Sequence, residues 1–193
     1  MTHPLFAPDI KFDEPYWWET ASPPEERTPT LPARVDVAIV GGGYTGLSAA
    51  LTLLGEGREV AVFDAERTGW GCSSRNGGQI GIKLRRSLDD VSRSYGRERA
   101  VAMVKDKVES RAYVAHLVES EGLDCDFTWC GRFLGAYRAA HYERLAAEVG
   151  PLQNEVGEEC HMVPRSEQRS ELGTDTYHGG QVLPHNASLD PGK

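Results

Sequence analysis

The 193-residue chain has no run of about eighteen apolar residues, the length that a membrane-spanning helix needs. Residues 1–6 also lack the basic and apolar blocks of a signal peptide. Basic residues are in the minority, with 21 Lys and Arg against 29 Asp and Glu, so the net charge is −8 and no basic footprint for nucleic acid exists. These absences predict a cytoplasmic protein with neither a membrane span nor a nucleic-acid partner.

Motifs for metal binding and hydrolysis are missing as well. The four cysteines are scattered and form no CxxC pair: Cys72, Cys125, Cys130 and Cys160. We therefore expect reduced thiols and no metal site. The chain has no GxSxG, its six histidines are dispersed, and no residue is marked as a catalytic acid or base.

A strand, a glycine turn and a helix are predicted in succession. Residues 35–40 are rich in β-branched side chains and nearly all apolar, which is typical of a central parallel strand covered on both faces. Gly41 allows a tight turn, Gly43 leaves room for a phosphate near backbone amides, and Gly46 lets the helix pack closely on the strand. The helix is expected over residues 44–56, with its positive N-terminal end facing a pyrophosphate. This order predicts a Rossmann-like dinucleotide-binding βαβ unit, although an ordinary βαβ turn remains an alternative.

The helix should bury one apolar stripe and end at Gly57. The stripe comprises Leu47, Ala50, Leu51 and Leu54. A second strand is expected over residues 59–64, and it ends at Asp64, eighteen positions after Gly46. An acidic residue near this spacing accepts hydrogen bonds from an adenosine ribose. A phosphate-binding P-loop is excluded because that motif needs Lys where the chain has Leu47.

Residues 67–81 are rich in glycine and amide side chains and poor in apolar ones. Such a segment exposes many backbone donors, so it is predicted to lie along the pyrophosphate and the ring system of the cofactor. A solvated surface loop is the alternative.

At five segments the chain resembles a known family: residues 16–20 (YWWET), 41–46, 69–79 (GWGCSSRNGGQ), 122–127 and 131–133. They are similar to the FAD-dependent amine and amino-acid oxidoreductases of the D-amino-acid oxidase superfamily, and most of all to its gamma-glutamylputrescine oxidoreductase branch. The resemblance implies an α/β fold in which a βαβ unit of the glutathione-reductase-like class binds FAD. Part of a mixed α+β substrate domain would follow.

The resemblance also implies the chemistry. A small amine or amino acid would pass a hydride from its C–N unit to the flavin N5, water would hydrolyse the imine, and dioxygen or another acceptor would reoxidise the flavin. Arg75, Asn76 and Gln79 would lie near the ring. The full set of expected FAD-binding residues is Gly41, Gly43, Tyr44, Thr45, Gly46, Asp64, Ala65, Arg67, Gly71, Ser73, Ser74, Arg75, Asn76, Gly77, Gly78 and Gln79.

Two positions depart from the family pattern, which commonly has Glu at Asp64 and Gly at Ser74. If position 74 needed a positive φ, Ser74 would reduce local stability. The chain is also short for the family, which predicts an N-terminal fragment. Two other functions remain open: a related sarcosine, glycine or D-amino-acid oxidase, or a non-catalytic truncated nucleotide-binding module.

Three segments are expected. Residues 1–33, rich in proline, should be an extended arm whose aromatic cluster at 16–18 packs on the body. Residues 34–85 should form the FAD-binding unit and its loop, and residues 86–193 a helical and partial α+β segment. From residue 84 onward we expect helices over 84–95, 97–121 and 139–149 and strands over 126–129 and 131–137. The long helix should bury Ala100, Val101, Val104, Val108, Ala112 and Ala115, and Pro151 should end the third helix.

Overall fold

The computed structural model describes residues 14–21 and 30–193. These residues divide into two compact units, and most of the proline-rich arm lies outside the described residues. The first unit comprises the described residues up to Gly78 together with Asp190–Lys193, and the second comprises Gln79–Leu189. Within the described residues, no helix is both long enough and apolar enough to cross a membrane.

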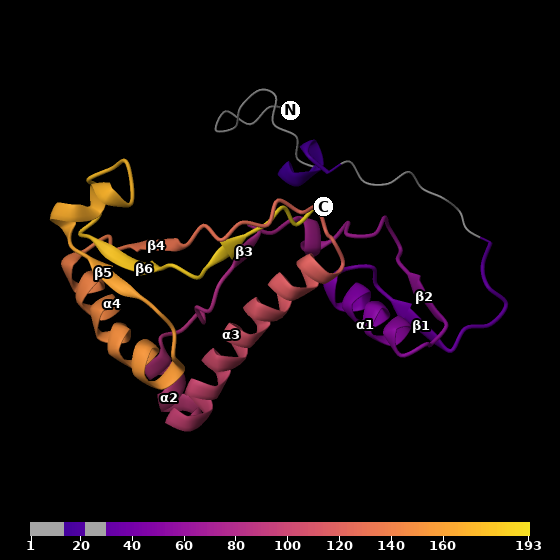
Figure 1. The fold of residues 1–193 in the computed structure, drawn as a ribbon, viewed down its shortest axis with the longest axis horizontal. Coiled ribbons are helices and arrows are strands. Elements are labelled where there is room, and N and C mark those ends of the chain that lie inside the picture. The colour runs from indigo at the N-terminus through magenta and orange to yellow at the C-terminus, as the bar shows by residue number, and fades with distance from the viewer. Residues whose placement is uncertain (1–13, 22–29) are drawn as a thin grey trace, which may run out of the picture. The chain divides into compact units, whose positions relative to one another are not determined.

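The first unit contains the βαβ arrangement predicted from the glycine pattern (Figure 1). Its elements are a 3₁₀ helix at Tyr16–Glu19, β1 (Val37–Val40), α1 (Tyr44–Gly55), β2 (Val60–Phe63) and a 3₁₀ turn at Cys72–Ser74. Strands β1 and β2 pair in parallel, with Val37 opposite Val60 and Val40 opposite Phe63. The parallel pair with its crossover helix confirms the Rossmann-like reading of residues 35–64.

Burial of the βαβ unit is one-sided, which corrects two expectations. The side chains of β1 alternate between half-buried and exposed, and Val40 is 91% exposed, so the strand is not covered on both faces. Of the predicted stripe on α1 only Ala50 is buried, while Leu47, Leu51 and Leu54 are exposed. The reason is that α1 covers the face of β1 that carries Ile39, and no described element covers the other side of either α1 or the strand pair.

The second unit contains two antiparallel sheets and three α-helices. Its elements are β3 (Gln79–Ile80), α2 (Leu88–Tyr95), α3 (Arg97–Ser120), β4 (Arg132–Gly135), α4 (Ala139–Pro151), a π-helical turn (Leu152–Val156), β5 (His161–Val163), a 3₁₀ helix (Arg165–Ser170), β6 (Gly180–Leu183) and β7 (Ala187–Ser188). The larger sheet has the order β4-β6-β5, and β3 pairs with β7. Every residue of the central strand β6 is buried.

Helices α2 and α3 are separated by a sharp turn. Ser87 caps α2 by accepting a hydrogen bond from the Asp90 amide at 3.1 Å, and Gly96, at φ +83°, divides the two helices. Their apolar faces enter a core that also receives the π-helical turn and β6. This core comprises Ile82, Leu88, Val91, Ala100, Val104, Leu152, Val156, Cys160 and Leu183.

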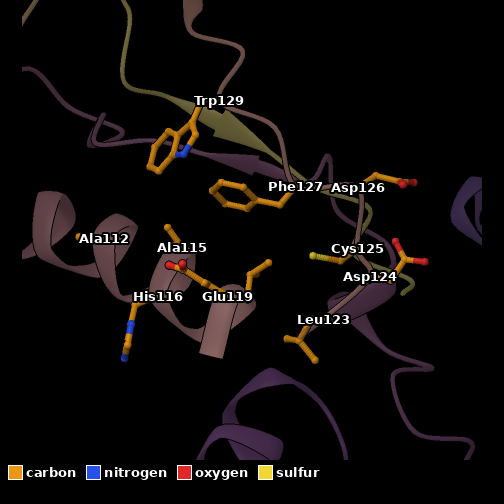
Figure 2. Close-up of a pocket in the computed structure, with 11 residues that line it drawn as sticks. Ala112, Ala115, His116, Glu119, Leu123, Asp124, Cys125, Asp126, Phe127 and Trp129 are labelled. Atoms are coloured by element: carbon orange, nitrogen blue, oxygen red, sulfur yellow. The ribbon is translucent and has the colours of Figure 1, made fainter. Parts of the chain in front are cut away.

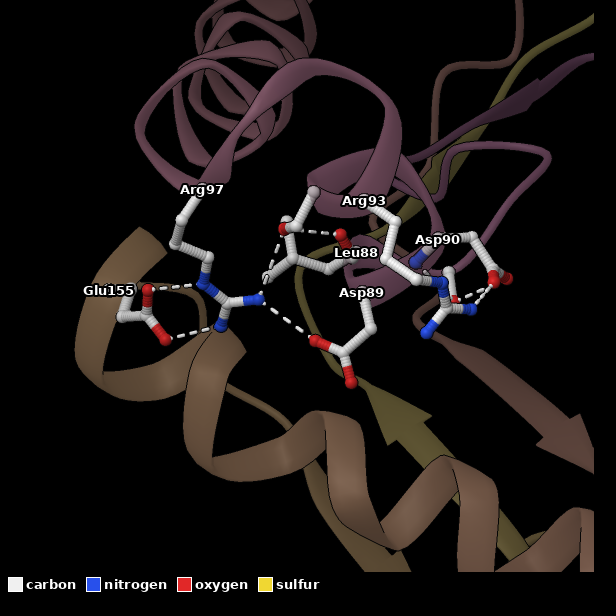
Figure 3. Close-up of polar contacts among 8 residues, drawn as sticks. Leu88, Asp89, Asp90, Arg93, Arg97 and Glu155 are labelled. Atoms are coloured by element: carbon white, nitrogen blue, oxygen red, sulfur yellow. Dashed lines mark hydrogen bonds and ion pairs between the residues drawn. The ribbon is translucent and has the colours of Figure 1, made fainter.

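An exposed ion-pair network reinforces the same corner of the second unit (Figure 3). The Arg97 guanidinium forms two hydrogen bonds with the Glu155 carboxylate and one, of 2.9 Å, with Asp89. The pairing with Arg97 lowers the pKa of the Glu155 carboxyl from its ordinary value. Because all three side chains are at least a third exposed, each pair contributes only about 0–1 kcal/mol to stability.

The long helix α3 departs from its predicted stripe in its C-terminal half. Ala100 and Val104 are buried as expected and Val101 and Val108 are partly buried, but Ala112 is exposed. Arg111, a charged residue, is buried in its place. Hydrophobic periodicity has no means of marking this position, because the burial of Arg111 depends on a carboxylate 47 residues away in the sequence.

Two further boundaries differ from the sequence prediction. Pro151 is the last residue of α4, but the helical path continues past it: Pro151 adopts φ −56° and ψ −43°, and a π-helical turn runs from Leu152 to Val156 before Gly157, at φ +86°. Proline's fixed φ is itself helical, and a π-helical turn accommodates the missing amide donor. The strand expected over residues 126–129 is reduced to a single bridge between Thr128 and Ser188.

Candidate cofactor site

The glycine turn between β1 and α1 depends on two glycines. Gly41 has φ +106°, in the left-handed region, and its amide donates to the Phe63 carbonyl at 2.7 Å. A Cβ on Gly46 would lie well inside van der Waals contact of the Gly41 carbonyl oxygen and against Ile39. The turn therefore requires Gly41 for its conformation and Gly46 for the close approach of helix and strand, as predicted.

Asp64 links the end of β2 to this turn. One carboxylate oxygen accepts a hydrogen bond from the Glu66 amide at 3.0 Å, and the other accepts from the Gly42 amide at 2.6 Å. The hydrogen bonds from Glu66 and Gly42 lower the pKa of the Asp64 carboxyl from its ordinary value. An ionised carboxylate has about four acceptor positions, so these two bonds leave capacity for a ribose hydroxyl. Gly42, which sequence reasoning did not single out, is thus a partner of Asp64.

The segment after β2 folds back on the start of α1. The Ser73 hydroxyl accepts a hydrogen bond from the Tyr44 amide at 3.0 Å, and a Cβ on Gly43 would lie 2.9 Å from the same oxygen. The Gly69 amide donates to the Gly42 carbonyl at 3.1 Å. Because Gly43 has no side chain, an oxygen atom fits beside the N-terminus of α1, and in this structure that oxygen is the Ser73 hydroxyl.

Ser74 shows no backbone strain, so the possible loss of stability at this position does not arise. It lies in the 3₁₀ turn Cys72–Ser74, and among the described residues Asp126 is the sole non-glycine with a positive φ. The Ser74 hydroxyl is buried and donates to the Gly69 carbonyl at 2.5 Å. A serine is therefore compatible with this turn.

Arg75 and Asn76 are occupied within their own unit. The Asn76 side chain donates to the Ser73 carbonyl at 2.8 Å and accepts from the Gly78 amide at 2.8 Å, so it holds the loop in shape. Arg75 donates to the Trp70 carbonyl at 2.9 Å, and its guanidinium lies over the Trp70 ring. Both residues thus shape the loop expected to face the flavin ring, and their approach to that ring stays a prediction.

The remaining predicted residues lie in the same stretch of chain. The loop positions Ala65, Gly71 and Gly77 are exposed, as is Thr45 in the first turn of α1, whereas Arg67 is half-buried and Gly78 is buried. Gln79 is the first residue of β3 and of the second unit. Trp17, Trp18 and Trp70, which the site prediction omitted, contact this loop directly.

A separate pocket of about 730 Å³ lies in the second unit, between the C-terminal part of α3 and residues 123–129 (Figure 2). Glu119, Asp124 and Asp126 are among its lining residues, together with Phe127 and Trp129. None of the predicted cofactor residues contributes to it. Burial raises the pKa of the Cys125 thiol at its edge, so this cysteine is a weak nucleophile.

The first unit fits a dinucleotide by the chemistry of its donors and acceptors. A glycine turn too tight for a Cβ leads into the N-terminus of α1, where the direction of the first-turn amides and the helix dipole favour a pyrophosphate. An ionised carboxylate, Asp64, stands at the end of the adjacent parallel strand. These features match the requirements of a pyrophosphate and a ribose.

Comparison with known proteins agrees with this chemistry. Residues 36–193 match the family model described as FAD-dependent oxidoreductase, DAO. The chain belongs to this family. The match covers the βαβ unit and the whole second unit, and it confirms both the family expected from the sequence and FAD as the family's cofactor.

Two curated relatives show the same relationship. The chain is 34% identical over 167 residues to the probable oxidoreductase OrdL of Rhizobium meliloti (strain 1021), covering 85% of this chain and 39% of the relative. It is 32% identical over 161 residues to the gamma-glutamylputrescine oxidoreductase of Escherichia coli (strain K12), covering 80% and 38%. The chain thus spans about two fifths of the length of these relatives.

Solved structures show the fold. The L-amino acid deaminase of Proteus myxofaciens has a TM-score of 0.70 at 17% identity, over 89% of this chain and 37% of that one. The glycine oxidase of Bacillus cereus ATCC 14579 has a TM-score of 0.61 at 21% identity, over 82% and 42%. The α/β flavoenzyme fold class expected from the sequence is therefore confirmed.

Proposed function

We propose that this chain contributes the FAD-binding part of an oxidoreductase that oxidises a C–N bond in an amine or amino acid. The observation that supports it most is the convergence of the glycine turn, Asp64 and the Ser73 segment on the N-terminus of α1. Residues 34–85, the proposed FAD-binding segment, would hold the cofactor through the predicted set from Gly41 to Gln79.

Within this proposal the chain's own residues bind and orient. The amides of Gly43 and Thr45 would donate to the pyrophosphate, as would the Tyr44 amide once a phosphate oxygen replaces the Ser73 hydroxyl, and Asp64 would accept from the adenosine ribose. The loop shaped by Asn76 would present its backbone donors toward the ring. Bound FAD supplies the hydride-accepting chemistry.

The relatives support a proposal for the substrate, first as a general class and then as a specific amine. An amine or amino acid suits the family, and a gamma-glutamylputrescine-like amine is the finer proposal, supported by the name of the Escherichia coli relative. Dioxygen or another acceptor would take the electrons. The cytoplasmic location and the division at residues 33 and 85 also remain proposals.

A spectroscopic experiment tests the proposal. The purified chain is incubated with excess FAD, desalted, and mixed anaerobically with gamma-glutamylputrescine, putrescine, sarcosine, glycine or a D-amino acid. We expect retained visible flavin bands that one amine bleaches, and the bleaching substrate decides between the branches. The Gly43→Val variant, whose side chain would collide with the Ser73 hydroxyl, should retain no flavin. If the wild type and Gly43→Val retained the same amount of flavin, the cofactor site would not lie at this glycine turn.

The charge of Asp64 gives the turn a pH dependence. Because amides of Glu66 and Gly42 hold its folded-state pKa below the ordinary value of 3.8, Asp64 stabilises the folded state above that value. This contribution is lost as the pH falls through the lowered pKa. The wild type should therefore be more stable than Asp64→Asn at pH 7 and lose that advantage below about pH 4, as measured by urea unfolding at each pH. A difference independent of pH would mean that the carboxylate charge has no role.

A further inference from the structure

Two indole rings and two guanidinium groups form a compact cluster beside residues 71–78, which are called the cofactor loop below. The Trp18 and Trp70 rings have centroids 5.0 Å apart. The Arg67 guanidinium lies 4.5 Å from the Trp18 centroid and 5.3 Å from that of Trp70, and the corresponding distances for Arg75 are 5.4 Å and 5.0 Å. Each ring is thus contacted by two cations, and Trp18 alone comes from the segment before β1.

Polar contacts attach the same segment to the loop and to the last residues of the chain. The Trp17 indole donates to the Asn76 carbonyl at 2.7 Å. The Thr20 hydroxyl donates to the buried carboxylate of Asp190 at 2.5 Å. A Cβ on Gly192 would lie 3.0 Å from the Trp17 Cβ, so the backbone at Gly192 passes close to the base of this side chain. Residues 16–20, called the strap below, therefore contact both segments within the first unit.

The cofactor loop needs such external contacts. Residues 71–78 include three glycines and a single three-residue 3₁₀ turn, so the loop has a large conformational entropy and little regular structure of its own. The internal hydrogen bonds of Asn76 shape residues 72–78 but do not attach the loop to the rest of the unit, and the Ser73 hydroxyl attaches it to α1 through the Tyr44 amide. Trp18 and Trp17 provide attachments from a segment more than fifty residues earlier in the chain.

We propose that Trp17 and Trp18 are positioning residues that hold residues 71–78 in the conformation that receives the cofactor. Trp18 acts through the guanidinium groups of Arg67 and Arg75, and Trp17 through the Asn76 carbonyl. The attachment itself stands on the contacts above. Its relevance to the cofactor rests on the function proposed for the loop.

Hydrogen exchange measured by mass spectrometry on the whole 193-residue chain tests the attachment. The variants are Trp18→Leu, which removes the π face, Trp18→Phe, which keeps one, and Trp17→Phe, which removes the indole donor. Glu19→Gln is the matched control, because this exposed residue lies in the same helical turn. Amides of the loop should exchange about tenfold faster in Trp18→Leu, the scale expected for losing two cation–π contacts, and nearly as in the wild type in Trp18→Phe and Glu19→Gln. Trp17→Phe should also raise exchange at the loop.

Two outcomes would overturn the proposal. One is loop exchange that is equal in all five proteins. The other is an equal increase in α1 and in the loop, because it would indicate a general loss of structure in the first unit. A parallel FAD titration distinguishes the two proposals. Faster loop exchange with unchanged FAD affinity would show that the strap attaches the loop but that the loop does not belong to the cofactor site. Faster exchange together with weaker FAD binding supports both.

Discussion

Replacing Arg111 with Met should lower the free energy of unfolding by about 3–5 kcal/mol. Arg111 forms a bidentate pair with Glu158, with N–O distances of 2.6 Å and 2.8 Å, and the two side chains are only 8% and 2% exposed. The variant leaves the Glu158 carboxylate buried without its counter-charge. Removing one member of a buried pair is far more costly than removing both, because the remaining charge keeps its desolvation penalty.

Urea unfolding of the whole chain, followed by circular dichroism, measures this effect. The double variant Arg111→Met/Glu158→Leu should recover most of the lost stability, since an apolar pair carries no stranded charge. Arg169→Met is the matched control: its partner Asp175 is 59% exposed, and the change should stay within about 1 kcal/mol. If the single and double Arg111 variants lost the same stability, packing rather than charge would explain the effect.

Two glycines of α1 should respond to alanine in opposite directions. Gly46→Ala places a methyl group against the Gly41 carbonyl oxygen, so the helix must move away from the turn, with a loss of about 1–3 kcal/mol and of FAD retention. Gly55→Ala, at the other end of the same helix, meets no atom within 4 Å and should add up to about 1 kcal/mol.

Thermal unfolding and FAD retention of the two variants, measured side by side, check this pair. Because both substitutions are Gly→Ala in one helix, helix propensity is the same and only the space around the Cβ differs. Equal effects of the two substitutions would show that α1 is free to shift on β1, and the close approach at Gly46 would then have no functional importance.

Local signals predicted the part of the fold that is proposed to hold the cofactor. The apolar run, the glycines at 41 and 46 and the acidic residue at 64 each act over a few residues, and the structure places them as expected. The hydrogen bond from the Gly42 amide to Asp64 was not predictable, because the direction of a backbone amide leaves no mark in the sequence. The contribution of Trp18 was equally hidden, since its partners lie 49 to 57 residues later.

The errors have a common physical origin in long-range packing. The stripe on α1 and the apolar strand β1 were expected to be buried from their composition, but burial needs a second covering layer that composition does not supply. Arg111 was hidden for the same reason, since its partner is distant in the sequence. Pro151 ends α4 as predicted, but the π-helical turn that follows it was not expected, because proline restricts the residue before it without preventing helix after it.

The strap's bond to Asp190 also bears on how the protein is made. Thr20 and Asp190 are 170 residues apart, and Tyr44 bonds to the Pro191 carbonyl across 147 residues. The second unit, by contrast, is continuous from Gln79 to Leu189. Contacts of such high sequence separation form late, and residues 79–189 are all synthesised before Asp190 and Pro191 can reach Thr20 and Tyr44. The contacts that join residues 16–20 and 44 to residues 190–191 can therefore form only after the whole intervening unit has been made.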